Sequence, residues 1–173
     1  MTELNEGELS FRFECRTNPF KYDEMAFYRN QFQAVCEGAK AVDFLCKDGS
    51  CGYLVEVKDY AQAPRTKPSD LPQEIAEKVR DTLAGLVACK ANANDHEERG
   101  RADQWLSSTR LRVVLHLEQP KRPSRLKPRV AEPQDLRQKL KQLLKAIDAH
   151  PMVADCAHTP SDVPWSVARR QHP

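Results

Sequence analysis

Two short apolar runs separated by a turn dominate the fold that this sequence can adopt. Residues 41–46 and 53–60 are rich in Val, Leu and aromatic residues, and Asp48-Gly49 lies between them. An Asp-Gly pair in this setting predicts a β-hairpin. Residues 71–89 repeat apolar side chains every three to four positions, which predicts a helix. The apolar run 111–117 predicts a strand, and a right-handed crossover would lay it parallel to 53–60.

The rest of the chain completes an α/β pattern. Period-two alternation predicts a strand over residues 9–15, and apolar spacing predicts helices over 22–37 and 136–147. We also expect a short helix over 95–106 and an edge strand over 152–156. The stretch 119–133 holds four prolines and five basic residues, so it is predicted to be an extended loop. The expected fold class is α/β, with a mixed central β-sheet flanked by helices.

The length of 173 residues and the hydrophobic content of 40% suit one ordinary domain. We place it over residues 1–157 and expect the Pro-rich stretch 158–173 to be a disordered tail. No run is long and apolar enough to span a membrane, and the first residues lack the features of a signal peptide. We therefore expect a cytoplasmic protein without a membrane partner. The six cysteines contain no Cys-x-x-Cys pair and are expected to be reduced.

Charge is unevenly distributed along the chain. From Arg110 to Lys145, eleven Lys and Arg residues face three acids, a surplus of eight. From Met1 to Glu37, four basic residues face seven acids, a deficit of three. A basic half suits a phosphate-bearing partner, although a solvated surface would account for the charge as well.

Three charged residues in the predicted hairpin carry the functional hypothesis. Because side chains alternate along a strand, Glu56 and Lys58 share one face, opposite Tyr53, Val55 and Val57. Any hairpin loop of even length puts Asp43 on that same face, and a four-residue loop would set it directly opposite Glu56. A surface ion pair is the alternative for Glu56 and Lys58. The simple turn predicts a cluster of two carboxylates and one amine.

Such a cluster suits a hard cation and a phosphate ester. Magnesium takes one or two carboxylates together with substrate phosphate, so Asp43 and Glu56 are predicted metal ligands, with the Val57 carbonyl as a further one. Mn²⁺ would be an alternative ion. The metal would lower the pKa of a bound water, and Lys58 would orient or deprotonate that water. Asp43, Glu56 and Lys58 are the predicted catalytic residues.

The pattern Asp43-x12-Glu56-x-Lys58 resembles the restriction-endonuclease-like PD-(D/E)XK phosphodiesterase superfamily. The resemblance covers residues 20–120 and implies a restriction-endonuclease-like core, Asp43 and Glu56 as metal ligands, and Lys58 as the catalytic lysine. The chain departs from the family in three ways. Val42 replaces the family's Pro, the helix after the motif lacks the Gln-x-x-x-Tyr of RecB-type nucleases, and one strand of the common core is not evident.

The functional prediction is a magnesium-dependent nuclease that hydrolyses DNA. Its expected nucleic-acid contacts are basic residues from two loops: Arg65, Lys67, Lys121, Arg122, Arg125 and Lys127. Alternatives are an RNA nuclease and an inactive nucleic-acid-binding or interaction subunit of the same fold. A homodimer and a larger complex both stay open. His116, in an apolar strand, is expected to be a core histidine without a metal.

Overall fold

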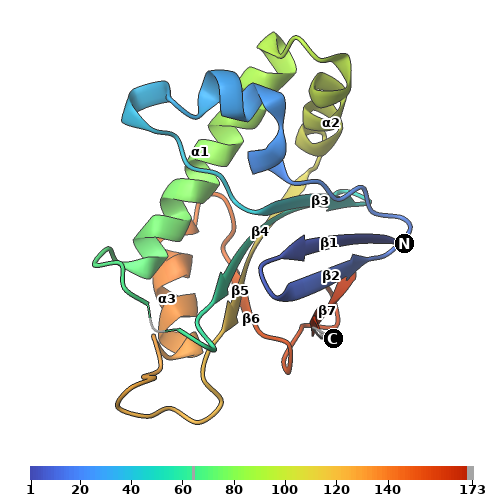
Figure 1. The fold of residues 1–173 in the computed structure, drawn as a ribbon. Helices are drawn as coiled ribbons and strands as arrows, with labels where there is room; N and C mark the ends of the chain where they lie inside the picture. Colours follow the sequence, from blue (N-terminus) through green and yellow to red (C-terminus); the bar gives the residue numbers. More distant parts are fainter. Residues whose placement is uncertain (64, 171–173) are drawn as a thin grey trace.

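A mixed four-stranded sheet forms the centre of the computed structural model, which describes residues 1–63 and 65–170 (Figure 1). Its strands are β3 (Phe44–Asp48), β4 (Cys51–Asp59), β5 (Arg110–Glu118) and β6 (Met152–Ala154), in the order β3-β4-β5-β6. The first pair is antiparallel, and the other two pairs are parallel. The predicted hairpin, the parallel crossover to residues 111–117 and the edge strand are therefore confirmed.

The hairpin has the register predicted for a four-residue loop, with one further pair formed. Lys47 pairs with Gly52 and Asp48 with Cys51, so the loop residues are Gly49 and Ser50. Gly49 has a φ of 56°, the left-handed conformation that a two-residue hairpin needs at its first loop position. Phe44 pairs with Val55, which sets Asp43 opposite Glu56 if the pairing is extended by one residue.

Three helices cover one face of this sheet (Figure 1). They are α1 (Leu71–Asn92), α2 (His96–Leu106) and α3 (Pro133–Leu144). All three were predicted, although α3 begins and ends three residues before the predicted range 136–147. Apolar side chains of α1 and α3 pack on Leu54, Val113 and Leu115 of the sheet. Asp95 caps α2 by accepting hydrogen bonds from the amides of Glu97 and Glu98. The prediction of a mixed sheet flanked by helices is confirmed.

The opposite face of the sheet is covered by a second sheet, which was not predicted. It consists of β1 (Thr2–Glu6), β2 (Leu9–Phe13) and β7 (Trp165–Arg169), in the order β1-β2-β7. Only β2 was expected. The prediction of a disordered tail over 158–173 is wrong for β7, because Trp165 is buried in this second core and pairs with Phe13. Residues 171–173 lie outside the described part of the chain.

The segment 22–37 is helical but is not the single amphipathic helix predicted. It consists of short turns: a 3-10 turn at Tyr22–Glu24, a π-helical turn at Tyr28–Phe32 and a 3-10 turn at Val35–Glu37. Cys36 has a φ of 52°, which ends any regular helix there. Met25 and Tyr28, two of the apolar positions that predicted the helix, are buried, but the segment divides into short turns instead of continuing as one helix. No helix among the described residues is long and apolar enough to cross a membrane.

Candidate functional site

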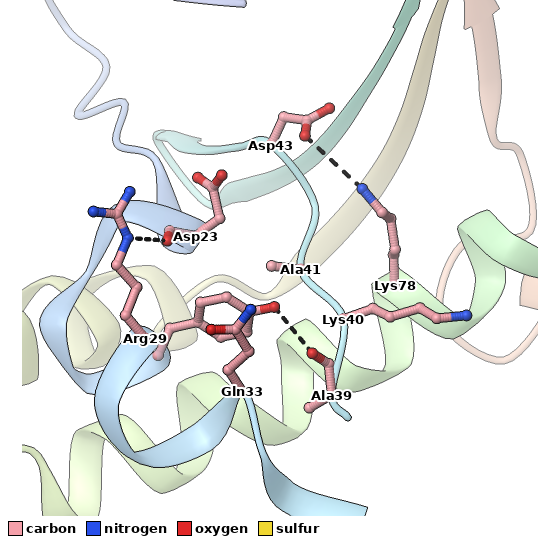
Figure 2. A pocket seen from close by; sticks show the side chains of 9 residues that line it. Asp23, Arg29, Gln33, Ala39, Lys40, Ala41, Asp43 and Lys78 are labelled. Carbon is pink, nitrogen blue, oxygen red and sulfur yellow. Dashed lines mark hydrogen bonds and ion pairs between the residues drawn. The ribbon is translucent and has the colours of Figure 1, made fainter. Parts of the chain in front are cut away.

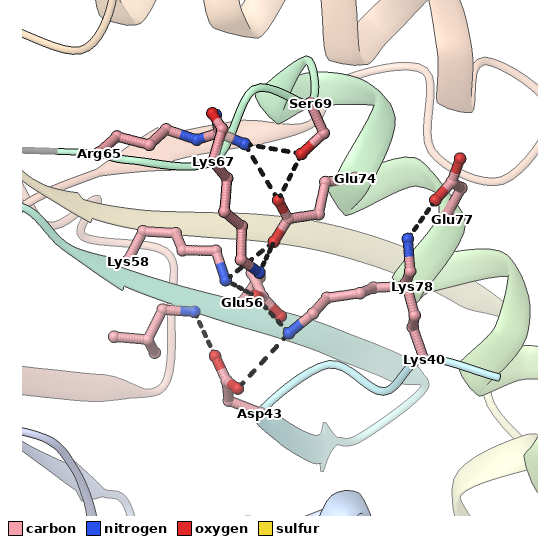
Figure 3. Close-up of polar contacts among 11 residues, drawn as sticks. Lys40, Asp43, Glu56, Lys58, Arg65, Lys67, Ser69, Glu74, Glu77 and Lys78 are labelled. Carbon is pink, nitrogen blue, oxygen red and sulfur yellow. Dashed lines mark hydrogen bonds and ion pairs between the residues drawn. The ribbon is translucent and has the colours of Figure 1, made fainter. Parts of the chain in front are cut away.

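The predicted site residues meet on the face of β4 that α1 covers (Figure 3). Glu56 and Lys58 project from β4, and Asp43 comes from the residue just before β3. The helix adds Glu74 and Lys78, which lie one turn apart on its inner side. These five residues are called the acid–lysine cluster below. Glu74 is not among the residues predicted for the site. Its spacing of four residues from Lys78 puts both side chains on one face of the helix, and this spacing is the sequence signal for it.

Glu56 is the centre of this cluster. Its side chain is 0% exposed, and its Oε1 lies 2.6 Å from the Nζ of both Lys58 and Lys78. Its Oε2 is buried and accepts no hydrogen bond from any residue in the described ranges. One carboxylate oxygen therefore pairs with two lysines while the other is buried without a donor, an arrangement that costs free energy.

Asp43 is held between β4 and α1. Its Oδ2 accepts a hydrogen bond of 2.7 Å from the Val57 amide, and its Oδ1 lies 3.9 Å from Lys78 Nζ. Burial, with a smaller contribution from the Glu56 charge, raises the pKa of Asp43 to about 7. A carboxylate pair of this kind gains from an added cation. Val57 was predicted to offer its carbonyl, whereas the contact observed is through its amide.

Lys58 is surrounded by three carboxylates, those of Glu56, Asp43 and Glu74. Burial alone would lower its pKa, but the charges of Glu56, Asp43 and Glu74 outweigh burial and raise it above its ordinary value. An ammonium group held in this way stays protonated at neutral pH, so it can bind an anion but cannot accept a proton. The predicted role of Lys58 in deprotonating a metal-bound water stays a prediction.

The loop before α1 is anchored to the cluster through Glu74. The Nη2 of Arg65 lies 3.1 Å from Glu74 Oε2, and Lys67 Nζ lies 3.4 Å from Glu74 Oε1. Burial would raise the pKa of Glu74, but the Lys58 and Lys67 charges lower it. The Arg65 side chain is only 11% exposed, so its role is to hold the loop. The Lys67 side chain is 66% exposed and can still face a partner.

A cavity of about 570 Å³ opens beside Asp43 (Figure 2). Lys40 and Lys78 line one side of it, with Asp43 above them in the view, and Asp23 and Arg29 line the other side. The Arg29 Nε donates to the backbone carbonyl of Asp23, which orients its guanidinium group. The cluster is thus reached from solvent through a polar opening that carries three cations.

The basic loop 119–132 lies near the end of α1 that begins at Leu71 (Figure 1). Lys121, Arg122 and Arg125 are exposed and form no ion pair with a residue that the structure describes. Lys127 Nζ lies 3.5 Å from Gln62 Oε1, which connects the two loops. Arg65 and Arg129 also line a common cavity of about 260 Å³. The predicted nucleic-acid contacts of both loops therefore adjoin one another.

A second group of potential ligands lies on the other face of β5. The ligand atoms of His116, Glu118 and Cys156 all lie within 4.8 Å of one another. The hydrogen bond from His116 lowers the pKa of Glu118 to about 2, so this carboxylate is charged. Burial, followed by the Glu118 charge, raises the pKa of the Cys156 thiol to about 12. His116 was expected to be a core histidine without a metal, because Cys156 is far along the chain and no local spacing connects the two.

These features describe an α/β protein with charged clusters on the two faces of its central sheet. No protein-family model and no solved structure matches the chain. It is similar to the cysteine–tRNA ligase of Neisseria meningitidis serogroup A / serotype 4A (strain DSM 15465 / Z2491). The two are 31% identical over an alignment of 212 positions, which covers 97% of this chain and 30% of that protein. The chain thus spans less than a third of the relative's length.

This likeness contradicts the predicted DNA nuclease. The relative is a ligase whose name specifies tRNA, so the predictions of a hydrolase and of DNA as the partner are wrong. The physical reason is that Asp43, Glu56 and Lys58 form a short motif that also suits a buried charge network, in which Lys58 is protonated. The likeness and the geometry do not single out magnesium as a cofactor. The resemblance to the restriction-endonuclease-like core stays a prediction.

Proposed function

We propose that this chain binds RNA of the tRNA class and serves a function related to tRNA ligation. The observation that carries this proposal is the likeness to a cysteine–tRNA ligase along 97% of the chain, which includes both sheets and all three helices. Because the chain corresponds to only 30% of that protein, we propose binding rather than ligation as the activity of the chain itself. A cytoplasmic location is part of this proposal.

The basic loop supports RNA binding on physical grounds. Lys121, Arg122 and Arg125 are exposed and unpaired within the described part of the molecule, so they can neutralise phosphates without breaking an ion pair. Helix α3 and the residue after it add exposed cations that follow the loop in the chain, namely Arg137, Lys139, Lys141 and Lys145. Such contacts respond to backbone charge and shape, which suits a structured RNA.

We further propose that Asp43 and Glu56 hold a divalent cation beside the bound RNA, on a restriction-endonuclease-like core. Glu56 Oε2 is buried without a hydrogen-bond donor from the residues described, and the pKa of Asp43 is raised, so a cation would stabilise both groups. Lys58 and Lys78, which pair with Glu56 Oε1, would attract the phosphate. In this role the cluster binds RNA and breaks no bond.

The test compares labelled tRNA with duplex DNA of equal length over a range of salt concentrations. We expect tighter binding of tRNA, with an affinity that falls as salt rises. Replacing Lys121, Arg122 and Arg125 together by Gln should weaken binding at least tenfold and reduce the salt slope by about one per lost phosphate contact. Asp43→Asn should remove any dependence of tRNA binding on divalent ions.

The control replaces three cations on elements away from the basic loop, Lys90 at the end of α1, Arg99 in α2 and Arg110 at the start of β5, by Gln. This control should bind tRNA like the parent chain. Equal affinity for DNA and tRNA, or a loop variant that binds normally, would overturn the proposal. The RNA should also be recovered at full length on a denaturing gel, and its cleavage would contradict a role limited to binding.

A further inference from the structure

We propose that His116, Glu118 and Cys156 form a binding site for a zinc-type transition-metal ion with an open fourth coordination position. The site is independent of the acid–lysine cluster, because it lies on the opposite face of the central sheet. In the parallel register, Glu56 and Lys58 pair with Leu115 and Leu117, whereas His116 and Glu118 alternate with these residues and face the second sheet.

The spacing of the three donor atoms suits one small ion. His116 Nε2 lies 3.0 Å from Glu118 Oε1 and 3.9 Å from Cys156 Sγ. Metal–nitrogen and metal–oxygen bonds of about 2.1 Å and a metal–sulfur bond of about 2.3 Å, in a tetrahedral arrangement, place such donors about 3.4–3.6 Å apart. The two distances from His116 lie within about half an ångström of this spacing, and the ligand atoms of all three residues lie within 4.8 Å of one another, so side-chain adjustments would bring them around one ion.

The donor types select the class of metal. A thiolate and an imidazole favour zinc and similar transition metals, whereas magnesium and calcium favour oxygen donors. Three protein ligands with an open fourth position are typical of zinc sites that bind water or an exogenous ligand. This donor set also distinguishes the site from the oxygen-rich pair of Asp43 and Glu56.

The surrounding structure holds the ligands in place. His116 is buried, and the edge of its ring packs against Phe11 at a centroid distance of 5.2 Å. The Cys156 amide donates a 2.7 Å hydrogen bond to Glu118 Oε1, which ties the chain after β6 to the end of β5. Adjacent parallel strands thus bring the three ligands together, and a supported ligand shell of this kind is what tight metal binding requires.

The open position has room for a ligand. Glu118 and Cys156 line a cavity of about 630 Å³, together with Lys121, Arg129 and His158. Arg129 pairs with Glu132 and Asp155 also lines the cavity, so Lys121 is the cation there that favours an anion or a deprotonated water as the fourth ligand. Lys121 also belongs to the basic loop, so the cavity borders the proposed RNA-binding surface. Metal binding is therefore measured without RNA.

The experiment titrates the reduced full chain with Co²⁺, which reports thiolate ligation through a sulfur-to-cobalt absorption band in the near ultraviolet. We expect the band to saturate at one equivalent and to disappear when Zn²⁺ displaces the cobalt. Cys156→Ser should abolish the band, and Glu118→Gln should weaken Co²⁺ binding at least tenfold. Circular dichroism of each variant verifies that it is folded.

Two controls separate this site from other thiols and carboxylates. Cys51→Ser changes another half-buried cysteine, and Asp43→Asn changes the acid–lysine cluster; both variants should retain the full band. A band that survives Cys156→Ser or is lost in Cys51→Ser would overturn the assignment. The absence of saturable binding in the parent chain would do the same, whatever the outcome of the RNA experiments.

Discussion

At the scale of single residues, Asp43 shows how burial changes the chemistry of a carboxyl group. It lies between a strand and a helix with one lysine 3.9 Å away and Glu56 nearby, and its pKa is raised to about 7. Near neutral pH this residue can hold or release a proton. The acid–lysine cluster is therefore sensitive both to pH and to a bound cation.

The raised pKa predicts how stability depends on pH. Between about pH 4 and pH 7, folded Asp43 holds a proton that the unfolded chain has lost, so the free energy of unfolding falls as pH rises. Asp43→Asn removes this titration but keeps an acceptor for the Val57 amide. Relative to the parent chain, the variant should gain about 1–3 kcal/mol between pH 4.5 and 7.5 in urea unfolding. Parallel pH profiles for the two proteins would contradict this assignment.

At the scale of elements, helix α1 depends on a close approach by the segment 22–37. Gly85 lies where this segment crosses the helix, and a Cβ atom there would collide with the Tyr22 hydroxyl and approach Phe32 to 3.0 Å. Glycine normally weakens a helix by about 1 kcal/mol relative to alanine. Here the absence of a side chain allows two elements to pack.

We predict that Gly85→Ala lowers the free energy of unfolding by about 1–2 kcal/mol, because overpacking exceeds the gain in helix propensity. Adding Tyr22→Phe removes the colliding hydroxyl and should restore much of the loss. As a control, Gly100→Ala on α2 meets nothing within 4 Å and should stabilise the protein by about 0.5–1 kcal/mol. Urea unfolding measures all three, and a neutral Gly85→Ala would show that the crossing is looser than described.

At the scale of the whole molecule, the two ends of the chain are joined in one sheet. β2 lies between β1 and β7, so residues near position 10 pair with residues near position 168. Trp165 packs on Phe13 at 5.6 Å and on Tyr53 at 5.2 Å, measured between ring centroids. The second sheet therefore closes one face of the central sheet only when both ends are present.

We expect Trp165→Ala to lower the melting temperature by about 10 °C, because removing a buried tryptophan costs about 3–5 kcal/mol. A chain that ends at residue 157 should lose more, since β2 would also lose the partner strand β7. Leu126→Ala, whose side chain is 86% exposed, should leave the melting temperature within about 2 °C. Thermal unfolding followed by circular dichroism measures each; an unaffected 1–157 chain would restore the original tail prediction.

Local patterns in the sequence determined most of the central sheet and its helices. The apolar alternation of β4 and β5, the turn at Gly49 and the apolar stripe of α1 are short-range signals, and they were sufficient to place Asp43, Glu56 and Lys58 on one face. These signals depend on backbone periodicity and turn geometry, which are properties of neighbouring residues.

Only the tertiary structure decided what lies around those residues and what they can do. Lys78 reaches Glu56 because α1 crosses β4, and that contact gives the Glu56 carboxylate a second lysine partner beside Lys58. Likewise, Cys156 meets His116 because two strands lie side by side, and β7 joins β2 across the full length of the chain. Contacts between distant segments are set by packing, which no local period in the sequence specifies.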